Sequence, residues 1–305
     1  MAELITPQLV TDTADTNGLD KAQSEFALQY LEYYYVNKEI VTSLASTDIS
    51  DLVTKFQTKF GLPITGKLDE QTVRAMHWPR CGCPDYETIS AQRGGQASKW
   101  GLKSLTYYIS DYVSGISKAD QDDLIDLAYQ QWEDHCELDI TRVDSSSQAN
   151  MVISTGSGRR ANFDGPGGTL AWAYLPPGSN FNGQLLMRFD LSETWTTNSR
   201  DRGILFLNVA CHEFGHFLGL DHSNQKQALM APYYTPGITK PQPNDDIPRI
   251  QNLYGRKTTP APKPPEPSAP NVPDNAAGTN SVTITGVDMS QITINGKSVV
   301  DFTLI

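Results

Sequence analysis

The sequence predicts an α+β protein in which a small three-helix unit precedes a larger domain of helices mixed with short strands. Two observations predict this class. Residues 21–77 carry apolar side chains three and four positions apart, which is the helical period. Residues 99–255 combine such segments with short apolar runs typical of strands. With 305 residues, the chain is long enough for two modest domains, each burying its own core.

Each helix of the first unit has its own signals. Residues 25–36 place aromatic side chains three and four apart, and we expect these aromatic residues, Tyr30 among them, to form core and not to bind a partner. In residues 46–61 a Ser or Thr is expected to cap the helix and Gly61 to end it. Asp69 is the expected N-cap of a third helix.

The larger domain alternates strand and helix signals. The expected strands are residues 105–110, 150–154, 168–175 and 184–190. The expected helices are residues 119–135 and 244–255, together with a histidine-bearing helix between them. The apolar face of the helix at 119–135 is expected to hold Leu124, Leu127, Ala128 and Trp132.

Changes in composition set the expected boundaries. We expect a disordered N-terminus at 1–20, a helical propeptide at 21–85, an activation segment at 86–98, a catalytic domain at 99–255, a Pro-rich linker at 256–280 and a β-rich tail at 281–305. Seven prolines in one stretch predict an extended linker. The tail is too short to bury a core alone, so it is either the start of a truncated domain or a set of strands that dock elsewhere.

Charge and hydropathy exclude several classes. A net charge of −11 argues against a nucleic-acid partner, because a phosphate-binding surface needs clustered Lys and Arg. No apolar run approaches the roughly 20 residues that span a bilayer. The first residues lack the basic stretch and apolar stretch of a signal peptide. Either such a signal has been removed or the protein is not exported by that route.

The segment CHEFGHFLGLDH at residues 211–222 predicts a metal site. His212 and His216 lie four positions apart, so a helix places them on one face. Gly219 lets the chain turn out of the helix, and His222 returns as a third ligand. Three imidazoles leave the fourth tetrahedral position of a zinc ion for water, as in catalytic sites. Glu213 can take a proton from that water without binding the ion.

The complete HExxHxxGxxH pattern resembles that of the metzincin metallopeptidases, and its surroundings resemble the matrixin branch. Ser223 follows the third histidine, and Pro232 and Tyr234 match a Pro-x-Tyr segment downstream. The resemblance implies a metzincin fold, a twisted mixed sheet with an active-site helix. It also implies that Met230 lies beneath the zinc ion and that the Pro-x-Tyr segment walls the S1′ pocket.

The same resemblance implies how substrate binds. A peptide is expected to pair with the strand that contains Ala171, as an added edge strand. Asn208 stands at a position that lines S1′ in the family, where Leu is frequent. A polar residue there weakens the expectation of a large apolar P1′ side chain.

The segment PRCGCPD at residues 79–85 is similar to the matrixin cysteine switch. A thiolate is a strong zinc ligand, so Cys81 is expected to fill the fourth position and keep a zymogen inactive. The resemblance implies that Arg80 and Asp85 pair and hold the segment. Cys83 departs from the family pattern, and we expect either a disulfide with another chain or added redox sensitivity. Arg93 is an inviting cleavage site for a trypsin-like activating protease.

Other metal ligands follow the family pattern only in part. Candidate calcium ligands are Asp164, Gly165, Gly167, Thr169, Asp190 and Glu193, because carboxylate and carbonyl oxygens suit Ca²⁺. The three histidines and one aspartate of a second, structural zinc are missing: Trp172 and Arg188 replace two of the histidines. His77 and His135 lie outside that region, so we expect one zinc ion, with the guanidinium of Arg188 in the vacated site.

Two further cysteines, Cys136 and Cys211, are expected to be buried thiols, although a bridge between them is the alternative. The resemblance as a whole implies a secreted zinc endopeptidase, made as a zymogen, that acts on proteins or peptides. The helical unit also resembles peptidoglycan-binding modules, which leaves a second hypothesis. In that hypothesis the chain associates with a cell wall, a glycan or a matrix and has little peptidase activity.

Overall fold

The computed structural model describes residues 18–37, 48–86, 98–258, 293–294 and 297–298. The chain divides into two compact units, Met1–Ala261 and Pro262–Ile305. The expectations for the first 17 residues, for the activation segment around Arg93, for most of the Pro-rich linker and for most of the tail lie outside the described residues.

The helical unit contains the three expected helices, which are α1 (Lys21–Tyr35), α2 (Ile49–Phe60) and α3 (Glu70–Met76). Gly61 ends α2 in the left-handed conformation with φ of 66°, and the Asp69 side chain caps α3, as the sequence predicts. The expected Ser or Thr cap of α2 is wrong, because the Asp48 carboxylate accepts from the Ser50 N–H. A carboxylate there also interacts favourably with the helix dipole.

The core of this unit combines apolar packing with one buried amide. Leu28, Leu31 and Phe56 are almost fully buried. Gln57 is fully buried beside them and accepts from the backbone N–H groups of Thr65 and Gly66. Its amide group also donates to the Thr72 hydroxyl, so one side chain closes the connection between α2 and α3.

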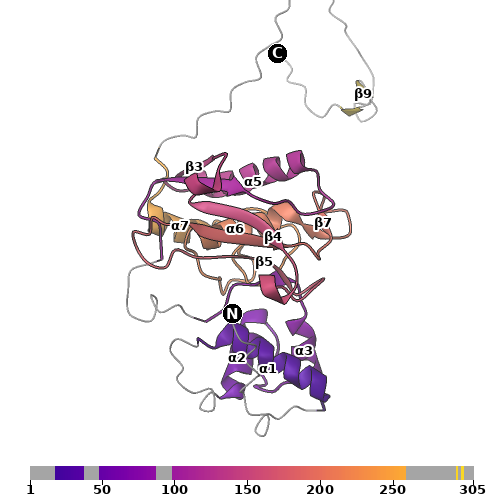
Figure 1. Ribbon diagram of the computed structural model, residues 1–305. Coiled ribbons are helices and arrows are strands. Elements are labelled where there is room, and N and C mark those ends of the chain that lie inside the picture. Colours follow the sequence, from indigo (N-terminus) through magenta and orange to yellow (C-terminus); the bar gives the residue numbers. More distant parts are fainter. Residues whose placement is uncertain (1–17, 38–47, 87–97, 259–292, 295–296, 299–305) are drawn as a thin grey trace, which may run out of the picture. The chain divides into compact units, whose positions relative to one another are not determined.

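The larger domain is built on a six-stranded sheet (Figure 1). Its strands are β1 (Arg80–Cys81), β2 (Ser104–Ile109), β3 (Asp139–Arg142), β4 (Met151–Gly156), β5 (Thr169–Ala173) and β6 (Leu185–Asp190). Their order is β1-β5-β6-β4-β2-β3; β5 is antiparallel to β6, and the other pairs are parallel. The sequence did not predict β1 or β3, since one is two residues long and the other buries only Ile140.

Three helices complete this domain: α5 (Lys118–Glu133), α6 (Phe206–Phe217) and α7 (Asp246–Tyr254). Helix α5 packs against α6, and α6 packs against β5 and β6, with one apolar core between them. The expected apolar face of α5 is partly wrong. Leu127 is 38% exposed, and Ile125 and Gln121 are buried with Ala128 and Trp132, at the spacing of a straight stripe.

Shorter elements surround this framework. They are the 3₁₀ turns η3 (Ser146–Gln148) and η4 (Arg159–Ala161), and the parallel pair β7 (Trp195–Thr196) and β8 (Ile204–Leu205). In the second unit, β9 (Thr293–Ile294) and β10 (Lys297–Ser298) form an antiparallel pair. Within the part of the chain that is described, no helix has the length and apolar character needed to cross a membrane.

The buried amide in the helical unit gives a first test. The substitution Gln57→Leu leaves the N–H groups of Thr65 and Gly66 without their acceptor. We expect the free energy of unfolding to fall by about 2 kcal/mol. Hydrogen exchange of the amides in α2 and α3 measures it. The control, Lys55→Ala, changes an exposed position of the same helix and should shift stability by less than about 0.5 kcal/mol. Equal protection in both variants would contradict the assignment.

Candidate metal centre and switch segment

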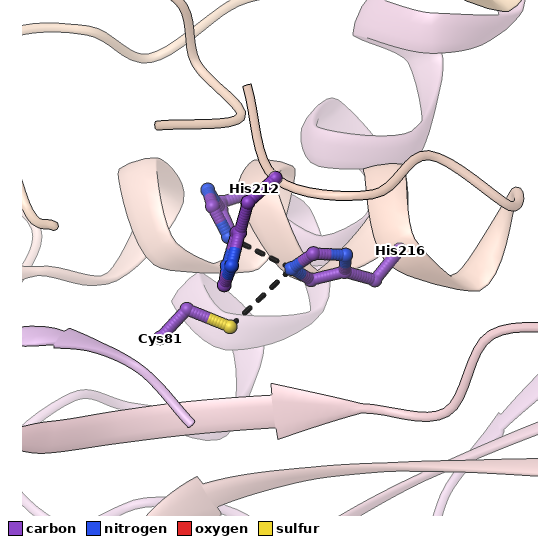
Figure 2. A group of neighbouring side chains, drawn as sticks. Cys81, His212 and His216 are labelled. Carbon is purple, nitrogen blue, oxygen red and sulfur yellow. Dashed lines mark hydrogen bonds between the residues drawn. The ribbon is translucent and has the colours of Figure 1, made fainter. Parts of the chain in front are cut away.

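The three histidines converge as the motif predicts. Helix α6 presents His212 and His216 one turn apart, and their Nε2 atoms lie 3.1 Å apart (Figure 2). Gly219, with φ of 99°, turns the chain out of the helix so that His222 returns toward the same point. One ligand atom from each histidine and the Cys81 sulfur all lie within 4.8 Å of one another.

The hydrogen bonds fix the tautomer of each ring. His212 Nδ1 donates to the Leu229 carbonyl and His216 Nδ1 to the Leu220 carbonyl, both at 2.7 Å. Burial lowers the pKa of His212 to about 3 and that of His222 to about 4, so the rings are neutral. A neutral ring that donates through Nδ1 carries a lone pair on Nε2. Three such lone pairs facing one buried point fit a metal ion, and the carbonyl acceptors orient the rings for it.

The sulfur of Cys81 completes this donor set. Cys81 Sγ lies 3.4 Å from His216 Nε2 and points toward the imidazoles (Figure 2). Burial raises the pKa of the Cys81 thiol well above its ordinary range. A thiolate in this position therefore requires a nearby cation. The donor set of three histidine nitrogens and one sulfur suits zinc.

Glu213 lies beside the ligands without joining the group of histidines. Its side chain is fully buried, and among the described residues neither carboxylate oxygen has a hydrogen-bond partner. Burial raises the pKa of Glu213 to about 8, and a cation bound beside it would lower that pKa and favour the carboxylate form. A carboxyl group kept free of partners next to a metal site is available to exchange a proton with a molecule bound there.

The turn that contains Leu229 and Met230 supports the candidate metal site. Met230 is fully buried, and the Leu229 carbonyl beside it orients His212. The buried carboxylate of Asp246 accepts from the N–H groups of Leu229 and Met230 and so fixes the turn. Gly215 lies against Met230, since a Cβ there would come within 2.2 Å of the methionine sulfur. Met230 therefore packs closely against Gly215 of α6. Its place beneath a zinc ion stays a prediction.

The switch segment lies in a cleft as an added strand. β1 pairs in parallel with β5, where Gly82 N–H donates to the Ala171 carbonyl at 2.8 Å. On its other side, Cys81 N–H donates to the Pro232 carbonyl, and Tyr234 N–H donates to the Pro79 carbonyl. Three residues predicted to bind substrate, Ala171, Pro232 and Tyr234, therefore bind the switch segment through their backbone groups.

The helical unit holds this segment through a buried arginine. The Arg80 guanidinium pairs with Asp85 at 2.9 Å, as the sequence predicts, and donates to the Tyr30 hydroxyl at 2.6 Å. It also lies 3.6 Å from the ring of Tyr34, a cation–π contact. The interpretation of Tyr30 as core alone is incomplete, because this residue is buried and also binds the switch.

Asp85 joins the switch to the metal site. Its second oxygen, Oδ1, accepts from His222 Nδ1 at 2.7 Å. Burial works against the charged form of Asp85, but Arg80, His222 and Lys59 hold its pKa well below the ordinary range. The carboxylate therefore orients the third histidine as the two carbonyls orient the others.

A small pocket opens next to the catalytic candidates. Its lining includes His212, Glu213 and Asn208. The Asn208 amide donates to the carbonyls of Thr235 and Ile238, at 2.9 and 2.6 Å. The polar group predicted for this pocket is therefore engaged with the loop that forms its wall. The effect of Asn208 on P1′ preference stays a prediction.

Comparison with protein families agrees with this geometry. Residues 99–255, more than half of the chain, match the Matrixin family model. The chain belongs to the matrixin family. Residues 25–76 match a second family model, described as a peptidoglycan binding domain.

Several matrixins are similar to this chain over most of its length. Interstitial collagenase of Bos taurus is 38% identical over 277 residues, which is 88% of this chain and 57% of the relative. Matrix metalloproteinase-20 of Homo sapiens is 35% identical over 86% of this chain and 56% of its own length. Stromelysin-2 of Rattus norvegicus is 37% identical over 87% and 58%. The chain thus spans a little over half the length of these relatives.

Matrixins depend on zinc and calcium, and hydrogen bonds join several of the predicted calcium residues of this chain. Thr169 N–H donates to Asp164, and Gly167 N–H donates to Glu193. Within the described residues, Asp190 Oδ2 is buried without a partner. Burial raises the pKa of Glu193 to about 7, and the nearby charges of Asp190 and Asp164 add to this effect. A divalent cation would offset that repulsion. The individual ligands, Gly165 included, stay predictions.

The two residues that replace structural-zinc histidines are neighbours. Trp172 and Arg188 face each other across β5 and β6, and the guanidinium lies 5.4 Å from the Trp172 ring. The indole N–H of Trp172 donates to the Ala161 carbonyl. A cation–π contact and an apolar cluster therefore occupy this side of the sheet. His77 stacks on Phe26, in the helical unit.

Sequence reasoning missed four contributors to this site. Tyr34, Asp246, Gly215 and Lys59 support the switch or the turn only through contacts between distant segments. The run of three tyrosines at 33–35 was a visible signal for an aromatic cluster. The other three carry no local signal that separates them from ordinary helix or loop residues. All four cysteines are free and buried, Cys136 and Cys211 among them.

The contact under the histidines can be tested by Gly215→Ala. A Cβ would meet the sulfur of Met230 at 2.2 Å and Trp132 at 2.8 Å, and such overpacking costs about 1–3 kcal/mol. We expect a lower thermal midpoint and weaker zinc retention under dialysis. Gly178→Ala is the matched control, because a Cβ there meets nothing within 4 Å. Equal behaviour of the two variants would refute the contact.

The buried ion pair between Arg80 and Asp85 can be tested by Arg80→Gln. The change leaves Asp85 buried without its main partner, which costs on the order of 3 kcal/mol. The peptide that carries Cys81 should then react with a thiol reagent roughly hundredfold faster in the native chain, as followed by mass spectrometry. The control Arg74→Gln breaks an exposed pair with Glu70 and should leave the rate unchanged. A rate in Arg80→Gln equal to that of the unchanged chain would sink the idea.

Proposed function

We propose that this chain is the latent form of a secreted zinc-dependent endopeptidase that hydrolyses peptide bonds of extracellular proteins. The observation that carries the proposal is the position of Cys81. Its sulfur lies among three Nε2 atoms, while its backbone occupies the cleft between β5 and the segment around Pro232. One strand thus blocks both the metal position and the peptide-binding edge.

His212, His216 and His222 would hold the zinc ion, with Cys81 as the fourth ligand in the latent form. Zinc, when bound, polarises a peptide carbonyl and makes water acidic enough to attack it at neutral pH. Glu213 takes the proton of the attacking water on its free carboxylate and later gives it to the leaving amine. The backbone of Ala171 and of Pro232 aligns the peptide by strand pairing, as it now aligns the switch.

Activation then requires that the switch leave the cleft. We assign residues 21–85 to a propeptide, 86–98 to the segment that an activating protease cuts, and 99–255 to the catalytic domain. Once the segment is cut, the edge of β5 and the fourth metal position become free together. The match of residues 25–76 to a peptidoglycan binding domain supports an added association with cell wall or matrix. It does not itself favour a binding module without activity.

A quenched fluorescent peptide library tests the proposal. The chain is compared intact, after proteolytic removal of residues 1–98, and after the same removal in Glu213→Ala. We expect cleavage by the shortened chain, little by the intact chain, and a rate lower by roughly 10²–10⁴-fold in the variant. A shortened chain that holds zinc and leaves every peptide intact rejects peptidase activity. Co-sedimentation with peptidoglycan would then support the binding-module hypothesis.

We also propose a single zinc ion, because Trp172 and Arg188 contact each other where the family places histidines. Metal analysis of the purified chain should give one zinc per molecule and at least one calcium. The double variant Trp172→His with Arg188→His should leave the zinc content at one, since the remaining ligands are also missing. Two zinc ions in the unchanged chain would overturn this count.

A further inference from the structure

The proposed mechanism does not use Cys83, which lies two residues after the switch cysteine. Cys83 is 5% exposed, and its sulfur donates to the Ala173 carbonyl at 3.1 Å. Its backbone N–H donates to Cys81 Sγ at 3.3 Å, so the chain turns tightly around the first sulfur. The turn brings the second side chain back toward the metal centre.

The position of this sulfur singles it out among the remaining cysteines. Ligand atoms of Cys81, Cys83, Glu213 and His216 all lie within 4.8 Å of one another. In the part of the chain that the structure describes, each such group of potential ligands contains Cys81 and His216. Cys136 and Cys211 belong to neither group, although both are buried thiols.

We propose that Cys83 is a second thiol ligand held in reserve at the zinc site, which binds the ion when Cys81 is unavailable. Binding would break the S–H bond of Cys83, release one proton to solvent and replace a zinc–water bond with a zinc–sulfur bond. It needs a side-chain rotation away from Ala173 while Gly82 stays paired to Ala171. A soft thiolate competes well for zinc against water, which favours this exchange.

The consequence is a latent state that survives the loss of one thiol. Modification or substitution of Cys81 alone would leave the fourth position blocked by Cys83. Loss of both sulfurs would open it. The inference rests on the proposed zinc site but concerns ligation, so it can be read without any peptide hydrolysis.

Cobalt(II) in place of zinc reports the sulfur ligand, because cobalt–thiolate bonds absorb in the near ultraviolet by charge transfer. Five full-length chains are loaded, all carrying Glu213→Gln so that they remain uncut: the parent, Cys81→Ser, Cys83→Ser, Cys81→Ser with Cys83→Ser, and Cys81→Ser with Cys136→Ser. Bound cobalt is quantified for each, and circular dichroism checks the fold. We expect the charge-transfer band in every chain except the one without Cys81 and Cys83.

Each other outcome overturns the proposal. If Cys81→Ser alone loses the band while still holding cobalt, Cys83 does not reach the ion. If the band persists without both residues, another thiol is the ligand. A Cys81→Ser chain that binds no cobalt shows that no second sulfur holds the metal. Failure of the peptidase proposal would look different, because it would appear as an inert shortened chain with these spectra unchanged.

Discussion

The position of the switch segment depends on the buried carboxylate of Asp85, which binds Arg80 within the segment and His222 of the candidate metal site. One oxygen accepts from the Arg80 guanidinium and the other from His222 Nδ1. A buried ion pair contributes little net stability, because desolvation offsets the attraction, but removing one partner costs about 3–5 kcal/mol. The pair therefore makes the position of the switch specific. If the segment shifted, His222 would lose the Asp85 carboxylate and the Arg80 guanidinium would lose the Tyr30 hydroxyl.

The arginine also explains why the helical unit must be folded for the switch to hold. The guanidinium is buried among tyrosine side chains of α1 and contacts the ring of Phe60 in α2. A cation is stable in such a place only because its donors are paired and its faces rest on aromatic rings. Two other hydroxyls of α1 also form hydrogen bonds outside the helix, Tyr34 with the Thr169 hydroxyl and Tyr33 with the Gly82 carbonyl. The two parts of the first unit thus share one polar interface.

Strand β1 pairs with β5 and so covers the edge of this strand. A two-residue strand gains hydrogen bonds from both sides, from β5 and from the segment around Pro232. Free sheet edges readily accept another strand, so a covered edge is protected until the segment leaves. Next to this edge, Trp172 and Arg188 form a cation–π contact beside an apolar cluster. This side-chain contact adds to the backbone pairing that joins β5 and β6.

The sequence by itself determined that His212, His216, His222 and Cys81 form the candidate metal site, and it determined the helices of the helical unit. Each of these features has a local signature, because histidines four apart share a helix face and Gly61 suits a left-handed cap. Tertiary structure alone decided three features. They are the burial of Arg80 between Asp85 and the tyrosines of α1, the support of Met230 by Asp246, and the place of Cys83. These contacts join residues many positions apart, and burial of charge and sulfur depends on which segments meet. A local pattern does not specify which distant segments pack together. For this reason the sequence also did not predict β1 or the exposure of Leu127.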